Sequence, residues 1–316
     1  MRERQVFLSG EFVPESQAGF SLVDAGVVMG HMVFEFTRTF NHKPFRLMDH
    51  LERLYASMRF AEIDSGMTID EMRDATLETL ALNDSLYAPE EDIAISHNVS
   101  NGPMDRFGPP FGGRNGPTVS IHTWPVSKRY PDMARLYREG VKAVIPSQRS
   151  LPARLIDPKV KNRSRMFYAI AEAQARRVDP DAWALLTDED GFITEGSGAN
   201  FMIVHKGELI SPEPRNILLG VTREVIVELA TELGIPFRET NIGTYEAINA
   251  DEAFFCSTPV VIAPVTSIEG HRIGREIPGP VTARLMEAFK DLAGLDFVAQ
   301  AAGLARAGEL THSRAD

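Results

Sequence analysis

Short apolar runs that alternate with polar residues dominate the first part of the chain. Residues 5–8 and 10–14 are joined by a turn at Ser9-Gly10, which predicts a β-hairpin. Residues 33–40 alternate with a period of two, the pattern of a strand with two different faces. Further strands are predicted over 92–99 and 118–123. This part of the chain is therefore expected to contain a β-sheet.

Helical spacing appears between these predicted strands. Asp49 precedes apolar residues at positions 51, 54, 55 and 58, so we predict a helix capped by Asp49. A second helix is predicted over 68–82, with acidic residues in its first turn. Residues 101–117 are rich in glycine and proline and predict a long loop, of the kind that covers active sites or is disordered.

The second half of the chain mixes both periodicities. We predict strands around 182–186, 192–194, 200–204, 208–210, 253–256 and 260–265, and helices over 164–177, 222–233 and 280–293. The tail from Gly303 is expected to be frayed. Together the patterns predict an α/β (α+β) fold with a small domain over 1–124, a linker over 125–140 and a larger domain over 141–316.

Composition narrows the possible partners of this 316-residue chain. Its net charge of −11 argues against binding to nucleic acid or to an anionic membrane. No stretch approaches the roughly 20 apolar residues of a membrane span, and the start has no signal-peptide pattern. The single cysteine, Cys256, fits a reducing compartment and a core position. We expect a cytoplasmic protein without a membrane partner and without a metal site.

Two residues have the character of catalytic groups. Lys161 precedes a predicted helix, and the neighbouring cations Arg163 and Arg165 would lower its pKa and so favour the nucleophilic amine. A solvated basic cluster is the alternative, and Lys159 is equally suitable on local grounds. Glu195 lies 34 residues after Lys161, between a strand and Gly-Ser-Gly. A carboxylate there could keep a ring nitrogen protonated, although a hairpin acid on the surface would look the same.

Two later segments have the character of anion sites. Gly220-Val221-Thr222 opens a predicted helix whose first amides could bind a phosphate. Ser257-Thr258 supplies a pair of hydroxyl groups at a predicted strand end. Each could also be an ordinary cap or turn. An amine, an acid and two phosphate sites in one chain together indicate pyridoxal phosphate as cofactor.

In this order, Lys161, Glu195, Gly220-Val221-Thr222-Arg223 and Ser257-Thr258 resemble the class IV (fold type IV) pyridoxal phosphate aminotransferases. That family includes branched-chain, D-amino acid and (R)-amine transaminases and aminodeoxychorismate lyase. The resemblance extends over residues 5–290. It implies a two-domain fold with the cofactor between the domains, and a homodimer whose partner subunit contributes near the substrate.

The resemblance also implies roles for individual residues. Lys161 would bind the cofactor covalently and carry the proton, and Glu195 would face the pyridine nitrogen. Arg53, in His-Leu-Glu-Arg-Leu, matches the arginine that binds the phosphate. The other implied cofactor contacts are Leu218, Val221, Thr222, Ser257 and Thr258.

The substrate pocket departs from each branch of the family. Phe36 occupies the glycine position of the branched-chain motif Phe-Glu-Gly-Ile-Arg. The arginine of the D-amino acid motif Thr-Arg-Gly is absent from Ser100-Asn101-Gly102, and the tyrosine that contacts the ring hydroxyl has no counterpart after Lys161. Arg106 or Arg114 on the long loop could bind a substrate carboxylate, or both could be solvated. The candidate pocket residues are Met29, His31, Phe34, Phe36, His97, Arg106 and Arg114.

The predicted function is a ping-pong transamination from a branched-chain type amino acid or a chiral amine to a 2-oxo acid. A D-amino acid or (R)-selective amine transaminase is the first alternative. A lyase of the aminodeoxychorismate type is the second, and Glu35 after Phe34 fits the aminotransferase branches better. A cofactor-binding protein without turnover is a different class that the loop departures leave open.

Overall fold

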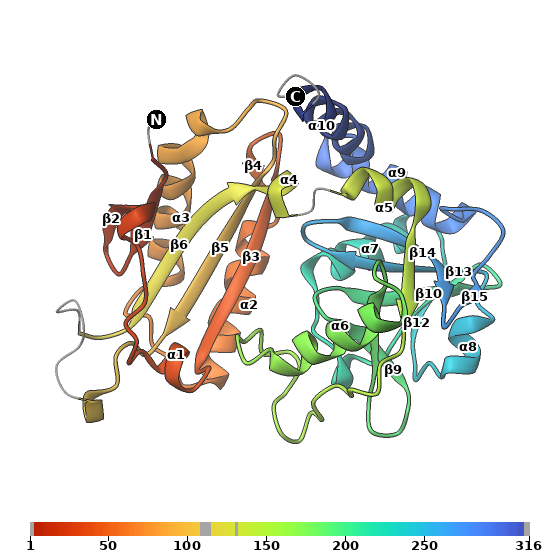
Figure 1. Ribbon diagram of the computed structural model, residues 1–316, viewed down its shortest axis with the longest axis horizontal. Coiled ribbons are helices and arrows are strands. Elements are labelled where there is room, and N and C mark those ends of the chain that lie inside the picture. The colour runs from red at the N-terminus through yellow and green to blue at the C-terminus, as the bar shows by residue number, and fades with distance from the viewer. Residues whose placement is uncertain (1–2, 108–114, 130–131, 313–316) are drawn as a thin grey trace. The chain divides into compact units, whose positions relative to one another are not determined.

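The computed structural model describes residues 3–107, 115–129 and 132–312, so Arg114 lies outside the described residues. The chain divides into two compact units (Figure 1). The first comprises Met1–Arg129 with Val160–Arg165, and the second comprises Tyr130–Lys159 with Met166–Asp316. The short segment 160–165 therefore belongs with the first unit, although its neighbours on both sides belong to the second.

The first unit contains a six-stranded antiparallel sheet with the order β2-β1-β6-β5-β3-β4. Strands β3 and β5 align Met32 with Ser100 and Arg38 with Ala94. The hairpin and the three longer strands predicted from the sequence are confirmed. The strands are β1 (Gln5–Leu8), β2 (Glu11–Pro14), β3 (Met32–Phe40), β4 (Lys43–Pro44), β5 (Ile93–Ser100) and β6 (Thr118–Pro125).

Helices α2 (Leu47–Phe60) and α3 (Ile69–Asn83) cover one face of this sheet (Figure 1). The helix predicted over 68–82 is confirmed as α3, and the structure shows that a capping box of Thr68 and Glu71 begins it. The predicted start of α2 was wrong. Arg46, in a left-handed conformation, precedes the helix, and Asp49 lies in its first turn, where the helix dipole still favours a carboxylate. The shorter helices of this unit are α1 (Ala25–Val28) and α4 (Val126–Arg129).

Alternation along the strands separates the two faces of the sheet. Val33, Ile95, Val99 and Val119 pack with Leu51 and Leu54 of α2 in the core on the helix side. Their neighbours therefore point to the opposite face, which carries mainly aromatic and polar side chains. These are Phe34, Phe36, Ser96, Asn98, Ser120, His122 and Trp124.

The second unit contains a larger mixed sheet with the order β12-β11-β10-β13-β14-β7-β8-β9. Because β9 also pairs with β10, through Glu195 and Asn200, the sheet closes into a ring. The strands are β7 (Val141–Val144), β8 (Trp183–Thr187), β9 (Ile193–Gly196), β10 (Asn200–His205), β11 (Glu208–Ser211), β12 (Phe237–Glu239), β13 (Glu252–Ser257), β14 (Val261–Ile268) and β15 (His271–Arg272). The helices are α5 (Met133–Glu139), α6 (Met166–Val178), α7 (Val221–Glu232), α8 (Thr244–Ile248), α9 (Pro280–Ala293) and α10 (Phe297–His312).

Three of these helices were not predicted, and the shortest of the three is α8. Helix α5 lies within the segment expected as a linker, and α10 follows the helix expected to be last. Phe297 at the start of α10 is 1% exposed, and its ring centre lies 5.5 Å from that of Tyr137 of α5. The sequence of α10 is rich in alanine and glycine and has no clear apolar stripe at helical spacing, so periodicity did not predict this helix. Aromatic packing such as that of Phe297 on Tyr137 holds α10 in position.

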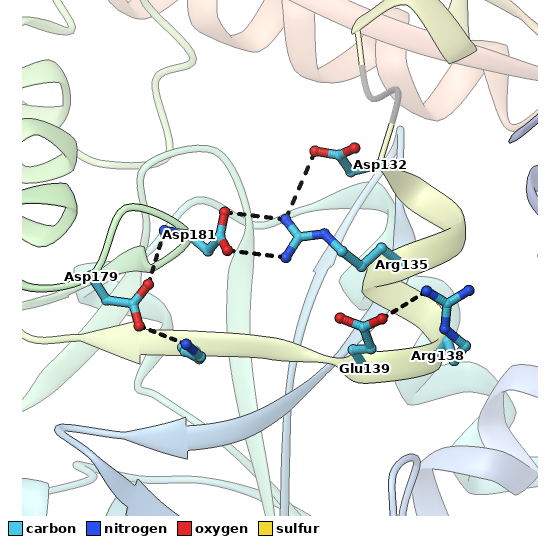
Figure 2. A network of polar contacts seen from close by, with 7 residues as sticks. Asp132, Arg135, Arg138, Glu139, Asp179 and Asp181 are labelled. Carbon is cyan, nitrogen blue, oxygen red and sulfur yellow. Dashed lines mark hydrogen bonds and ion pairs between the residues drawn. The ribbon is translucent and has the colours of Figure 1, made fainter. Parts of the chain in front are cut away.

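Charged residues around α5 and β7 form a network on the surface of the second unit (Figure 2). Arg135 approaches Asp181 at 3.3 Å and Asp132 at 3.8 Å, and Lys142 approaches Asp179 at 2.7 Å. Exposed pairs of this kind contribute little to stability individually.

Within the part of the chain that the structure describes, no helix is long and apolar enough to span a membrane.

Candidate active site

The first unit places Lys161 on the aromatic and polar face of its sheet. Segment 160–165 runs along the edge of β3, where the amide of Phe34 donates to the carbonyl of Lys161 at 3.0 Å and the amide of Arg163 donates to Met32 at 2.9 Å. Asn162 pairs with Val33, whose side chain faces the helices. Lys161 and Arg163, the neighbours of Asn162, therefore project to the face of Phe34. The amide of Lys161 also donates to Ser57 Oγ of α2 at 3.2 Å.

The Lys161 ammonium lies above an aromatic ring and among other cations. Its Nζ is 5.0 Å from the centre of the Phe34 ring, and the guanidinium carbons of Arg163 and Arg165 lie 3.8 and 5.5 Å from the same centre. Arg163 and Arg165 thus share one aromatic ring with Lys161. Lys159 has a different environment, because its Nζ lies 3.4 Å from Asp157 in an exposed ion pair of the second unit.

Arg53 forms a buried ion pair on the helix side of the first unit. Its Nε and Nη2 donate to the two carboxylate oxygens of Glu35 at 2.8 and 2.7 Å, and Glu35 is fully buried. Burial alone would raise the pKa of Glu35, but the charge of Arg53, helped by His50, outweighs it and holds that pKa well below its usual range. His50 Nδ1 lies 3.2 Å from the carboxylate without hydrogen-bond alignment, and burial lowers the pKa of His50. Glu35 thus fixes the guanidinium of Arg53 in one orientation.

The second unit holds the Glu195 carboxylate with three neutral donors. Tyr168 Oη donates to Oε1 at 2.8 Å, while Asn200 Nδ2 and the amide of Leu218 donate to Oε2 at 3.0 and 3.1 Å. Asn200 also donates to the Leu218 carbonyl at 2.7 Å and so links Glu195 to the segment before α7. Glu195 is only 6% exposed. A carboxylate fixed in this way can present negative charge in a defined direction, as required to hold a protonated ring nitrogen.

The start of α7 has the form of a phosphate site. Gly220 occupies the cap position and has no side chain to cap the helix, whose first intrahelical bond runs from Glu224 N to Gly220 O at 2.9 Å. The amides of the first turn therefore lack a capping side chain, and the helix dipole favours an anion beside them. A Cβ on residue 220 would approach Asn200 Oδ1 to 2.2 Å, so only glycine fits there without displacing Asn200.

The remaining predicted cofactor contacts also lie in the second unit. Ser257 ends β13, and Thr258 follows it; both are partly exposed. Cys256 is buried, and this burial raises the pKa of its thiol to about 12. Arg223 donates from Nε to Ser211 Oγ at 3.1 Å and pairs with Glu239, so it braces α7 against β11 and β12.

The candidate substrate residues lie in different surroundings within the first unit. Phe34 and Phe36 share the aromatic and polar face. His97 aligns with Glu35 on the helix side and is fully buried, with its Nε2 2.8 Å from Thr76 Oγ1. Met29 and Arg106 are exposed, and His31 Nε2 lies 2.7 Å from the Ala61 carbonyl.

Each unit thus holds its own set of candidate side chains, with Lys161, Arg53 and Phe34 in the first and Glu195, Leu218 and the start of α7 in the second. Sequence reasoning did not identify Tyr168 and Asn200 as partners of Glu195, or Glu35 as the partner of Arg53. Glu35 alone of these residues gave a sequence signal, because an acidic side chain within a predicted strand requires a partner when it is buried. Among the described residues, no cluster of histidine, cysteine and acidic side chains could hold a metal ion.

Comparison with known proteins identifies the family. The model of amino-transferase class IV matches residues 32–268. A putative branched-chain-amino-acid aminotransferase of Methanocaldococcus jannaschii is 34% identical over 289 residues, which cover 91% of this chain and 96% of that protein. A D-alanine aminotransferase of Bacillus licheniformis is 27% identical over 288 residues, covering 91% and 96%.

Solved structures give the same result. The branched-chain aminotransferase of the thermophilic archaeon Thermoproteus uzoniensis, crystallised with norvaline, is 29% identical with a TM-score of 0.81, covering 94% of this chain and 97% of that one. The branched-chain aminotransferase of Escherichia coli is 27% identical with a TM-score of 0.81, covering 92% and 95%. The mixed α/β fold and the predicted family are thereby confirmed. The chain belongs to the class IV aminotransferases and is a transaminase.

Proposed function

We propose that this enzyme uses pyridoxal phosphate to transfer an amino group from a branched-chain type amino acid or a chiral amine to a 2-oxo acid in a ping-pong cycle. Class IV aminotransferases depend on this cofactor. The observation that carries the proposal is the fixed Glu195 carboxylate, with its three neutral donors and its link through Asn200 to the glycine-capped start of α7. A buried, oriented acid beside an anion site matches a ring nitrogen and a phosphate on one small molecule.

Within this proposal each side chain has a separate task. When bound, the cofactor supplies an electron sink for the carbon that loses its proton. Lys161 forms the covalent attachment and moves that proton at Nζ. Glu195 holds the ring nitrogen protonated, with Leu218 beside the ring. Val221, Thr222, Ser257 and Thr258 donate to the phosphate, and Arg53 adds its charge from the orientation that Glu35 imposes.

Two matched lysine variants test the cofactor attachment. Lys161→Ala should abolish both the visible absorbance of bound cofactor and amino transfer, because the amine that lies over the Phe34 ring is lost. Lys159→Ala should retain both, since Lys159 is held in an exposed pair with Asp157. Loss of both properties in the Lys159 variant, with retention in the Lys161 variant, would reverse the assignment. Absence of cofactor absorbance in the wild-type protein supplied with pyridoxal phosphate would refute the cofactor proposal itself.

Half-reactions identify the donor class. The enzyme is mixed separately with L-leucine, D-alanine and (R)-1-phenylethylamine, and loss of the visible cofactor band is followed. Bleaching mainly by L-leucine supports the branched-chain type donor, which the names of the relatives favour. Bleaching mainly by D-alanine or by the amine would replace it with the D-amino acid or (R)-amine alternative.

We further propose that the enzyme is a homodimer. Exposed apolar side chains gather where residues 20–29 lie beside residues 102–107, joined by hydrogen bonds from Ala25 N to Gly102 O and from Met104 N to Val23 O, both 2.9 Å. Such a patch is unusual on a monomer's surface. The exposed residues are Phe20, Leu22, Val27, Val28, Met29 and Phe107. Sedimentation of wild type and Val27→Glu should show a dimer and a monomer, respectively. The proposal places this dimer in the cytoplasm, where Cys256 would remain reduced.

A further inference from the structure

Arg163 is anchored more firmly than an ordinary surface arginine. Its Nε and Nη2 both donate to Asn98 Oδ1, at 2.9 and 2.6 Å. The guanidinium also stacks on the Phe34 ring, with its central carbon 3.8 Å from the ring centre. Asn98 and Phe34 are themselves buried. The residue as a whole nevertheless remains exposed, so the sheet fixes a cation that solutes can still reach.

The position of Arg163 relates it to the reacting amine. Lys161 and Arg163 are two residues apart on one edge segment, so their backbones are about 7 Å apart and their side chains lie on one face. Both reach the ring of Phe34. A molecule whose reacting carbon lies at Lys161 Nζ therefore extends within reach of the Arg163 guanidinium.

The charge in this region favours an anion. Lys161, Arg163 and Arg165 surround one aromatic ring in a protein whose net charge is −11. His122, on the same face, adds no charge, because burial, with the charge of Arg163, lowers its pKa to about 4. A guanidinium presents a planar fork of N–H donors that matches a carboxylate.

We propose that Arg163, held by Asn98 and Phe34, is the residue that binds a carboxylate of the amino donor and of the 2-oxo acid. This inference rests on the proposed function and deepens it by naming the group that recognises the substrate. It assigns to the sheet face the role that the sequence suggested for Arg106 or Arg114. Arg106 stacks on its own neighbour Phe107 at 4.9 Å, in an exposed short helix, and has no comparable anchor.

The test measures binding of two unreactive carboxylates, 4-methylvalerate and glutarate, to the full-length enzyme loaded with pyridoxal phosphate. Calorimetric titration of Arg163→Gln should show binding weakened roughly 10- to 100-fold, the value of a charge-assisted hydrogen-bonded contact. Arg163→Lys should recover only part of the loss, since an ammonium lacks the planar fork. Asn98→Ala should give an intermediate loss because the guanidinium keeps its charge but loses its anchor. Arg154→Gln, which removes an exposed pair with Glu189, is the matched control and should bind as wild type does.

The outcomes separate the possibilities. If Arg163→Gln binds both probes more weakly, Arg163 binds the carboxylate nearest the reacting carbon. If it binds only glutarate more weakly, Arg163 binds a distal carboxylate. Either result supports the inference. Unchanged binding in Arg163→Gln, or a loss confined to Arg106→Gln, would overturn it. If the glutamine variant does not fold, Arg163→Lys and Asn98→Ala decide the question. A wild-type enzyme that binds carboxylates through Arg163 but transfers no amino group would refute the proposed function alone.

Discussion

Replacing Arg53 with methionine should destabilise the first unit strongly. The two side chains of the Arg53–Glu35 pair are 12% and 0% exposed, and two hydrogen bonds of 2.8 and 2.7 Å join them. Removing one partner leaves a buried charge without compensation, which costs about 3–5 kcal/mol. Converting Glu35 to glutamine in the same protein removes that charge. The double variant Arg53→Met with Glu35→Gln should therefore recover more than half of the loss.

The loss should also depend on pH. In the wild type the pKa of Glu35 is depressed, so the stability from the pair is present above the ordinary pKa and is lost only as pH falls through the lower, folded-state value. In Arg53→Met burial dominates and raises the pKa of Glu35, so protonation relieves the penalty as pH falls toward that value. Protonation of neighbouring His50 acts in the same direction. The difference in unfolding free energy between variant and wild type should shrink between pH 7.5 and pH 5.

Urea unfolding of the cofactor-free protein measures this effect without the contribution of Arg53 to phosphate binding. Trp124 lies in the first unit and Trp183 in the second, so a Trp183→Phe background lets Trp124 fluorescence report the first unit. A loss below about 1 kcal/mol would show that the pair is not buried as described. A loss that is equal at both pH values and unaffected by Glu35→Gln would refute the reasoning as well.

Three further results are expected. Tyr168→Phe removes one donor from Glu195 and should weaken cofactor affinity about 5- to 10-fold, measured by titrating the cofactor-free protein with pyridoxal phosphate; unchanged affinity would contradict this. Gly220→Ala should weaken the affinity for pyridoxal phosphate further, because the new Cβ would displace Asn200. The control Gly19→Ala should leave the affinity unchanged, since a Cβ at residue 19 has no atom within 4 Å. Equal affinities in the two variants would contradict the described packing. The Cys256 thiol is buried, and burial raises its pKa to about 12. Iodoacetamide at pH 8 should therefore label this thiol slowly in the native protein and readily in the protein unfolded by urea. Rapid labelling of the native protein would show that the thiol is accessible.

Much of the fold and of the candidate chemistry was predictable from the sequence because it depends on local patterns. The period of two over 33–40 and the turns around it predicted β3, since a strand with two different faces must alternate. The acidic residues in the first turn of the segment 68–82 helped to predict α3 for a similar local reason. The order of Lys161, Glu195, Gly220-Val221-Thr222 and Ser257-Thr258 predicted the family, because these groups are spaced along the chain in a characteristic way.

The tertiary structure decided what distant residues do to one another. Lys161 and Lys159 were equivalent in the sequence, and only the pairing of Asn162 with β3 places Lys161 on the face of Phe34. Tyr168 reaches Glu195 across 27 residues, and Arg163 reaches Asn98 across 65. Contacts of this range leave no periodic trace in a single sequence, because the side chains that make them are selected by position in space. The sequence by itself therefore determined the class of chemistry, while the packing of strands and helices determined which amine, which acid and which cation stand where that chemistry requires them.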